Sequence, residues 1–171
     1  MSKTYKLCAT ALLAAISVAA NAFTVVIVGN AVSFTYLPCF VAAAYLGVIP
    51  ATVVGFVGDL VAGYLFPKGA FNLLISLAST LMGIIPGLVY RFLPCTRQTK
   101  LTLSLVITFV VCSAGINTYA MWQYVSTKYA TFWVYFAIRV PVQALNAAVN
   151  GVILALLQQS NALSKLFPSA Q

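Results

Sequence analysis

The sequence predicts an all-α integral membrane protein, a bundle of six transmembrane helices forming one domain over residues 1–171. Sixty-three per cent of its residues are hydrophobic and only 6% are charged, whereas roughly a quarter of the residues in soluble domains are charged. A helix needs about 20 apolar residues to cross a bilayer, so the chain has room for about six crossings. We place them near residues 7–28, 36–48, 51–66, 71–92, 101–122 and 132–157.

The first of these runs begins like a secretory signal peptide. Lys3 and Lys6 precede an apolar stretch, and residues 20–22 read Ala-Asn-Ala, the form of a cleavage site. The apolar run nevertheless continues to Val28, which is long for a cleaved signal and right for a full crossing. We therefore predict an uncleaved first helix.

The remaining runs follow in order. The second and third are short and are joined by residues 47–50, which include a glycine and a proline, so they predict a tight helical hairpin in which one arm does not fully cross. The fourth, fifth and sixth runs are each long enough to span the hydrocarbon core.

The basic residues predict the orientation in a cell membrane. In the six-span order, one side carries Lys3, Lys6, Arg91, Arg97, Lys100 and Lys165, and the other side carries Lys68 and Lys128. An excess of Lys and Arg marks the cytoplasmic side. Both termini are therefore expected in the cytoplasm, and the loops near residues 29–35, 67–70 and 123–131 are expected outside.

Several classes of function are disfavoured by composition. The basic residues lie mainly at the ends of apolar runs and no nucleic-acid-binding motif is present, so nucleic acid is not an expected partner. The chain has no histidine, and its four cysteines (Cys8, Cys39, Cys95 and Cys112) are far apart, so we expect neither a metal site nor a cofactor. With one acid and no phosphate-binding loop, we do not expect an enzyme, and any energy from ATP must come from another chain.

Two charged residues fall inside predicted spans. Asp59 is the only acid in the chain, and Arg139 is the only basic residue well inside a span. A charge in the hydrocarbon costs about 2.5 to 3.5 kcal/mol on insertion scales. They could pair with each other or with backbone carbonyls to fix helix packing, or Arg139 could line an outward cavity and meet a carboxylate or phosphate.

Polar side chains continue from Arg139 along one helical face. The sixth span carries Gln143, Asn146 and Asn150 at i+4, i+7 and i+11, and the fourth span carries a second stripe of Asn72, Ser76, Ser79, Thr80 and Gly83. Two polar stripes that begin at the same membrane face could line a solute pocket. Alternatively, their side chains could form hydrogen bonds between the helices. The ligand candidates are the upper members, Asn72, Ser76, Arg139 and Gln143; Asn146 and Asn150 are expected to pack.

Aromatic residues gather at the predicted outer ends of spans five and six. They are Trp122, Tyr124, Tyr129, Trp133 and Tyr135. They could form an interfacial aromatic belt or stack on a planar ligand. For the second case we include Trp122 and Trp133 in the candidate site, together with Asn30 of the first outer loop.

The first span also carries Ala11, Ala15 and Ala19 at i+4 spacing. Small residues at this spacing let another helix approach closely. The ladder could serve internal packing or a partner protein.

The chain resembles the S components of energy-coupling-factor (ECF) vitamin transporters, and within them the folate-type family. The similarity covers most of the chain, and its most specific part is the pattern G-D-L-x-x-x-x-L-F-P-x-G-x-F, here Gly58 to Phe71. The segment before it, VSFTYLPCFVAAAYLGVIPATVVGFV from Val32, the INT of Ile116 to Thr118 and the AIRVP around Arg139 add to it.

This resemblance implies a six-helix S component that captures a vitamin outside the cell. It would dock on a transmembrane coupling subunit driven by two cytoplasmic ATPase subunits. In that family the small residues of the first helix contact the coupling subunit, which would make Ala11, Ala15 and Ala19 an interface. The pocket is built from outer loops and the upper ends of helices.

The chain departs from the folate-type pattern at two places where the ligand should lie. Asn72 to Ser76 replace an aromatic residue followed by P-G-F-T, and Val142 stands where a lysine is common. Folate, cobalamin and another vitamin therefore remain open. Two other classes of function are a self-sufficient secondary transporter, for which Asp59 could be an ion site, and a membrane scaffold holding Arg139 in a permanent pair with Asp59.

Overall fold

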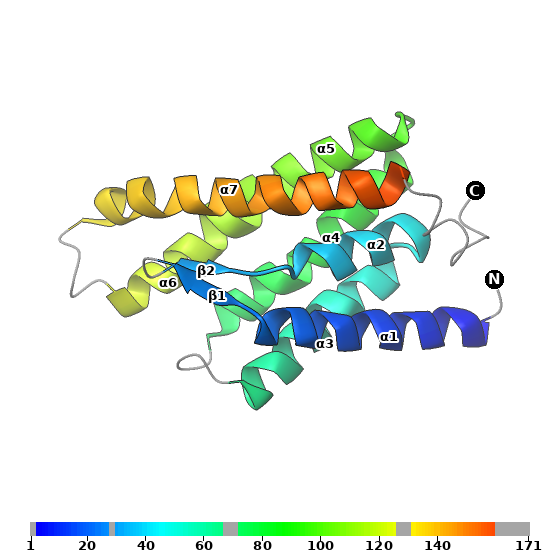
Figure 1. The fold of residues 1–171 in the computed structure, drawn as a ribbon, viewed down its shortest axis with the longest axis horizontal. Helices are drawn as coiled ribbons and strands as arrows, with labels where there is room; N and C mark the ends of the chain where they lie inside the picture. Colours follow the sequence, from blue (N-terminus) through cyan, green and yellow to red (C-terminus); the bar gives the residue numbers. More distant parts are fainter. Residues whose placement is uncertain (1–2, 28–29, 67–71, 126–130, 160–171) are drawn as a thin grey trace.

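The computed structural model describes residues 3–27, 30–66, 72–125 and 131–159, which form a bundle of long helices with one small hairpin (Figure 1). In chain order its elements are α1 (Lys3–Ala22), β1 (Val25–Ile27), β2 (Asn30–Val32), α2 (Tyr36–Tyr45), α3 (Val48–Leu65), α4 (Leu73–Phe92), α5 (Arg97–Thr108), the π-helix η1 (Phe109–Asn117), α6 (Thr118–Val125) and α7 (Phe132–Gln159). The predicted all-α membrane bundle is confirmed.

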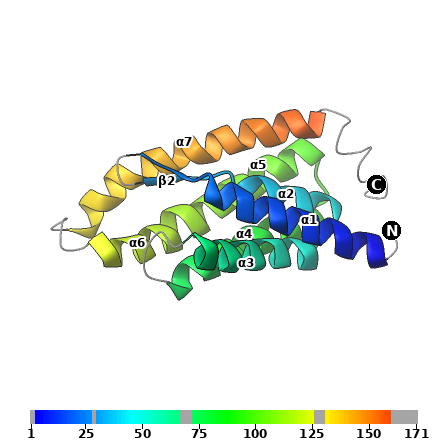
Figure 2. The same cartoon turned by 60° about the horizontal axis from the view of Figure 1, so that its bottom comes forward.

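Five helices in the described ranges are long and apolar enough to cross a membrane. They are Lys3–Ala22, Val48–Leu65, Leu73–Phe92, Arg97–Tyr124 and Phe132–Gln159, and Tyr36–Tyr45 is a shorter apolar helix. The fifth of the predicted runs thus comprises α5, η1 and α6 in succession. The beginning of α1 and the end of α7 lie at the same end of the bundle (Figures 1 and 2).

The first helix is shorter than the sequence predicts. It ends at Ala22 rather than continuing to Val28, and Val25–Ile27 pairs antiparallel with Asn30–Val32. The run from Thr24 to Ile27 consists of β-branched residues, whose side chains favour extended backbone. High hydropathy is therefore not a helix signal here, because the apolar residues after Ala22 enter a hairpin.

Glycines allow α3 to lie close to two neighbouring helices. A side chain at Gly83 of α4 would collide with the backbone of Ala51 in α3, and one at Gly58 of α3 would collide with Ser17 of α1. Gly47, with a φ of 102°, occupies the left-handed region at the turn from α2 into α3, where glycine has no steric penalty. The predicted hairpin therefore has its turn at Gly47, with α2 as its short arm and α3 as an arm long enough to cross.

The π-helix interrupts the long helix that begins at Arg97. One side-chain hydrogen bond follows the five-residue spacing of a π-helix: the Thr118 hydroxyl donates to the Ser113 carbonyl, five residues earlier, at 2.7 Å. π-Helical turns are rare and are frequent at functional sites. This one contributes two residues to the cavity described next.

Candidate ligand-binding cavity

A cavity of about 400 Å³ lies in the half of the bundle away from the start of α1. Its walls come from the end of α1, the segments flanking the β-hairpin, the start of α2, α3, the first half of α4, η1, α6 and the N-terminal part of α7. Its hydroxyl groups belong to Thr24, Ser33, Thr35, Tyr36, Ser76, Ser79, Ser113 and Tyr124, and its amides to Asn21, Asn72, Asn117, Gln143 and Asn146. Within the described ranges, the charged residues of the wall are Asp59 and Arg139.

The polar stripe of the sixth span lies on one buried face of α7. Arg139, Gln143, Asn146 and Asn150 are all buried, as their spacing predicts. The first three line the cavity. Asn150 instead donates to the Ser33 carbonyl at 3.2 Å and to the Asn146 carbonyl at 2.9 Å, so it joins α7 to the segment after β2.

Arg139 is the largest fully buried side chain in the described chain, with 2% of its surface exposed. One terminal nitrogen donates to the Tyr135 hydroxyl at 2.7 Å. Its Nε is buried and has no hydrogen-bond partner among the described residues. A buried donor without a partner is costly, so Arg139 retains hydrogen-bonding capacity beside the cavity.

Asp59 faces the same cavity from α3. The Ser76 hydroxyl of α4 donates to its Oδ2 at 2.8 Å. Both charged residues are in the described ranges, and no ion pair joins them there. The wall therefore presents one carboxylate and one guanidinium, each held by a neutral hydroxyl.

Only the part of the α4 stripe near the start of the helix lines the cavity. Ser76 and Ser79 line it, and Asn72 does so while capping α4, because its side-chain oxygen accepts from the Leu74 N–H at 2.9 Å. Thr80 instead bonds back to the Ser76 carbonyl. Gly83 packs against α3.

The two tryptophans lie outside the cavity lining within the described residues. Trp122 contacts Phe132 edge-on, with ring centroids 5.6 Å apart, and Trp133, 70% exposed, also packs against Phe132. Their positions suit an aromatic cluster between α6 and α7. Tyr124 of the same predicted group does line the cavity, whereas Tyr129 and the side chain of Asn30 lie outside the described part of the structure.

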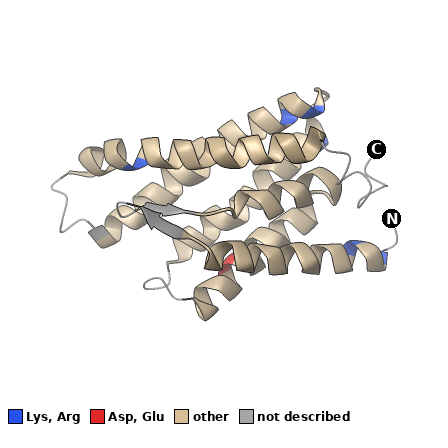
Figure 3. Cartoon of the chain, viewed as in Figure 1, with Lys and Arg blue, Asp and Glu red and all other residues tan. Residues whose placement is uncertain are grey.

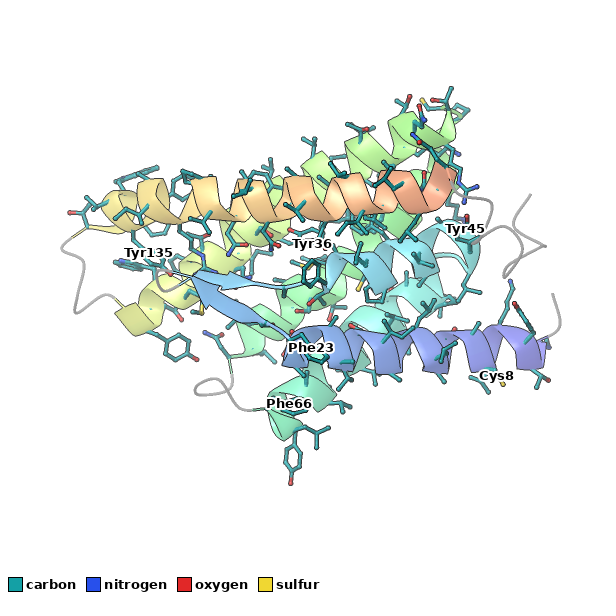
Figure 4. The ribbon with its side chains drawn as sticks, in the orientation of Figure 1. Cys8, Phe23, Tyr36, Tyr45, Phe66 and Tyr135 are labelled. Atoms are coloured by element: carbon teal, nitrogen blue, oxygen red, sulfur yellow. The ribbon has the colours of Figure 1, made fainter. Side chains whose placement is uncertain are left out.

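The sequence reasoning missed a polar group deep in the wall. Tyr36, at the start of α2, shares a hydrogen bond with Ser113 of η1, and Asn117 lines the cavity four residues further on. Figure 4 shows Tyr36 in the middle of the bundle and Tyr135 on α7. A serine and an asparagine at i and i+4 in an apolar run were the available signal.

Comparisons with known proteins agree with this architecture. A crystal structure described as FolT bound with folic acid superimposes with a TM-score of 0.69 and 24% identity, covering 96% of this chain and 97% of that one. The comparison with curated proteins found no significant match. The family model described as "ECF-type riboflavin transporter, S component" matches residues 1–165. The chain therefore belongs to this family of ECF S components: it is a multi-pass, substrate-binding subunit of a vitamin transporter and not an enzyme.

Proposed function

We propose that the cavity binds riboflavin or a closely related flavin. The observation that carries the proposal is the composition of the wall: among the described residues, neutral hydroxyls and amides predominate, and one acidic and one basic side chain offset each other. Riboflavin is uncharged and combines a planar ring with a polyhydroxylated chain, so hydroxyl and amide partners suit it. The family match to riboflavin-type S components supports the same choice.

The size of the cavity is consistent with this ligand. Pockets for small organic ligands occupy about 300 to 1,000 Å³, and this one has about 400 Å³. Cobalamin contains several times as many non-hydrogen atoms as riboflavin. The volume therefore disfavours cobalamin, one of the vitamins that the sequence left open.

The first prediction concerns direct binding by the purified chain. Riboflavin at 100 times its dissociation constant is expected to stabilise the protein by about 2.7 kcal/mol, because it binds only the folded state. A thermal-shift screen with riboflavin, folate, pantothenate, pyridoxine and cobalamin, followed by equilibrium dialysis, measures this. A screen in which riboflavin has no effect and another vitamin does would refute the assignment.

Folate is the second candidate, supported by one feature of the cavity. Asp59 could accept from the amino group and ring N–H of a pterin, and Arg139 could meet the glutamate carboxylates. The fold similarity to FolT is in line with this possibility.

Substituting Asp59 by Asn separates the two candidates. If a pterin pairs with the carboxylate, Asp59→Asn should weaken folate binding by about 100-fold, since a buried charge-assisted pair is lost. Riboflavin offers one ring N–H between two carbonyl groups, so its affinity should change by no more than about threefold. Ser76→Ala, which removes only the donor to Asp59, is the matched control.

The coupling partners follow from the family, and we propose α1 as their contact surface. The exposed surface of α1 includes Ala11, Ala15 and Ala19. Their small side chains would let a helix of another protein approach closely. The partners would be a transmembrane coupling subunit and two ATPase subunits. We retain the orientation predicted from the charges, with both termini in the cytoplasm of a cell-membrane protein.

Enlarging the middle alanine should block transport without affecting capture. Ala15→Leu places a bulky side chain where another helix must approach closely, so vitamin uptake with the coupling subunits should fall about tenfold or more. Vitamin affinity of the isolated chain should not change. The control is Leu12→Met, an exposed apolar position of the same helix, and equal loss of uptake in both variants would refute the interface.

A further inference from the structure

A second recess, of about 820 Å³, lies at the end of the bundle where α1 and α5 begin. Four basic side chains line it: Lys6 of α1, Arg91 of α4, and Arg97 and Lys100 of α5. Figure 3 shows the Lys and Arg residues of the described chain gathered at this end, apart from one position on α7. The vitamin cavity uses none of these residues.

No acidic side chain pairs with these cations in the described part of the chain. The only acidic side chain of the protein is Asp59, and it lines the other cavity. Four like charges around one recess repel one another in the absence of a counter-anion. The positive charge of the recess is therefore not neutralised by the chain's own side chains.

Neutral groups hold three of the cations in place. The Arg97 guanidinium lies over the Tyr45 ring, 4.6 Å from its centroid, and Arg91 lies 5.4 Å from the Phe92 centroid. Lys100 Nζ donates to the Tyr90 carbonyl at 3.3 Å. Aromatic faces and carbonyls orient a cation without neutralising it. Figure 4 labels Tyr45 at this end of the bundle.

Apolar residues at the recess distinguish a lipid from a free anion. Ile49 lines the recess and is 77% exposed, and Phe92 beside Arg91 is 68% exposed. A ligand with an anionic headgroup and acyl chains would use both kinds of surface, whereas a soluble phosphate would use only the cations. Basic pockets between transmembrane helices bind anionic lipid headgroups in this way.

We propose that this recess is a binding site for an anionic phospholipid, with the headgroup phosphate between Arg91, Arg97 and Lys100. Arginine and lysine donate charge-assisted hydrogen bonds to phosphate oxygens. With the orientation predicted from the charges, the lipid would come from the cytoplasmic leaflet, which is rich in anionic headgroups. A bound lipid would stabilise the connection between α4 and α5 and the start of α1.

The test compares lipids on the full chain in detergent by native mass spectrometry. Phosphatidylglycerol is expected to be retained at one copy per chain at concentrations where phosphatidylcholine of the same acyl composition is not. Glycerol 1-phosphate supplies the soluble form of the headgroup. Equal retention of both lipids, or binding of glycerol 1-phosphate as tight as that of phosphatidylglycerol, would overturn the proposal.

Matched single-charge variants locate the site. Arg97→Gln should weaken phosphatidylglycerol binding about fivefold, whereas Lys3→Gln, at the same end but outside the recess lining, should change it by less than about twofold. The triple variant R91Q/R97Q/K100Q should lose the preference for phosphatidylglycerol. Vitamin affinity, measured in parallel, reports whether each variant is folded. An equal effect of Arg97→Gln and Lys3→Gln would show that only the overall charge matters and refute the site.

Discussion

Replacing Arg139 by Ala is expected to weaken vitamin binding by about 100-fold, because truncating a buried, hydrogen-bonded charge costs about 2 to 5 kcal/mol. The guanidinium is 2% exposed, lines the cavity and has a buried Nε with no partner in the described residues. A ligand that supplies an acceptor would satisfy this group. Equilibrium dialysis of the variant with riboflavin and folate measures the effect.

The control for Arg139 is Tyr135→Phe. This change removes the hydroxyl to which the guanidinium donates but keeps the charge and the ring, so affinity should fall by less than about tenfold. Melting temperatures of both variants without ligand separate binding from folding. If Arg139→Ala lowers the melting temperature and leaves vitamin affinity unchanged, Arg139 is a packing residue and its assignment to the site is wrong.

The largest effect on stability is expected at Gly83. A methyl group there would collide with the backbone of Ala51, so Gly83→Ala forces α4 away from α3 and should destabilise the protein by about 2 to 3 kcal/mol. Both helices contribute walls to the cavity, so vitamin affinity should fall as well. Thermal denaturation in detergent, with and without riboflavin, measures both effects.

Gly63 provides the matched control. It lies in α3, where it lines the cavity, and a Cβ added there meets no atom within 4 Å. It is therefore a control for stability measured without ligand and not for vitamin affinity. Gly63→Ala should therefore leave stability unchanged or raise it by up to about 1 kcal/mol through helix propensity. A melting temperature for Gly83→Ala equal to that of Gly63→Ala would contradict the close packing of α3 on α4.

Helical spacing in the sequence predicts which side chains share a face of one helix, but not which residues of different helices meet. The spacing of Arg139, Gln143 and Asn146 predicts a shared helical face, and that face is buried with all three side chains at the cavity. Helical spacing is a local property, so a sequence reports it directly. The same reasoning could not join Tyr36 to Ser113, because that hydrogen bond links residues far apart in the chain.

The sequence by itself determined the membrane bundle, the excess of basic residues on one predicted side and the polar faces of α4 and α7. Hydropathy, charge and helical spacing are properties of neighbouring residues, so they can be read directly from the sequence. Only the tertiary structure decided that α1 stops at Ala22, that η1 brings Ser113 and Asn117 into the wall, and that Asp59 bonds to Ser76 without pairing with Arg139. These features depend on how neighbouring elements meet, because strand pairing and contacts between helices are set by packing across the bundle.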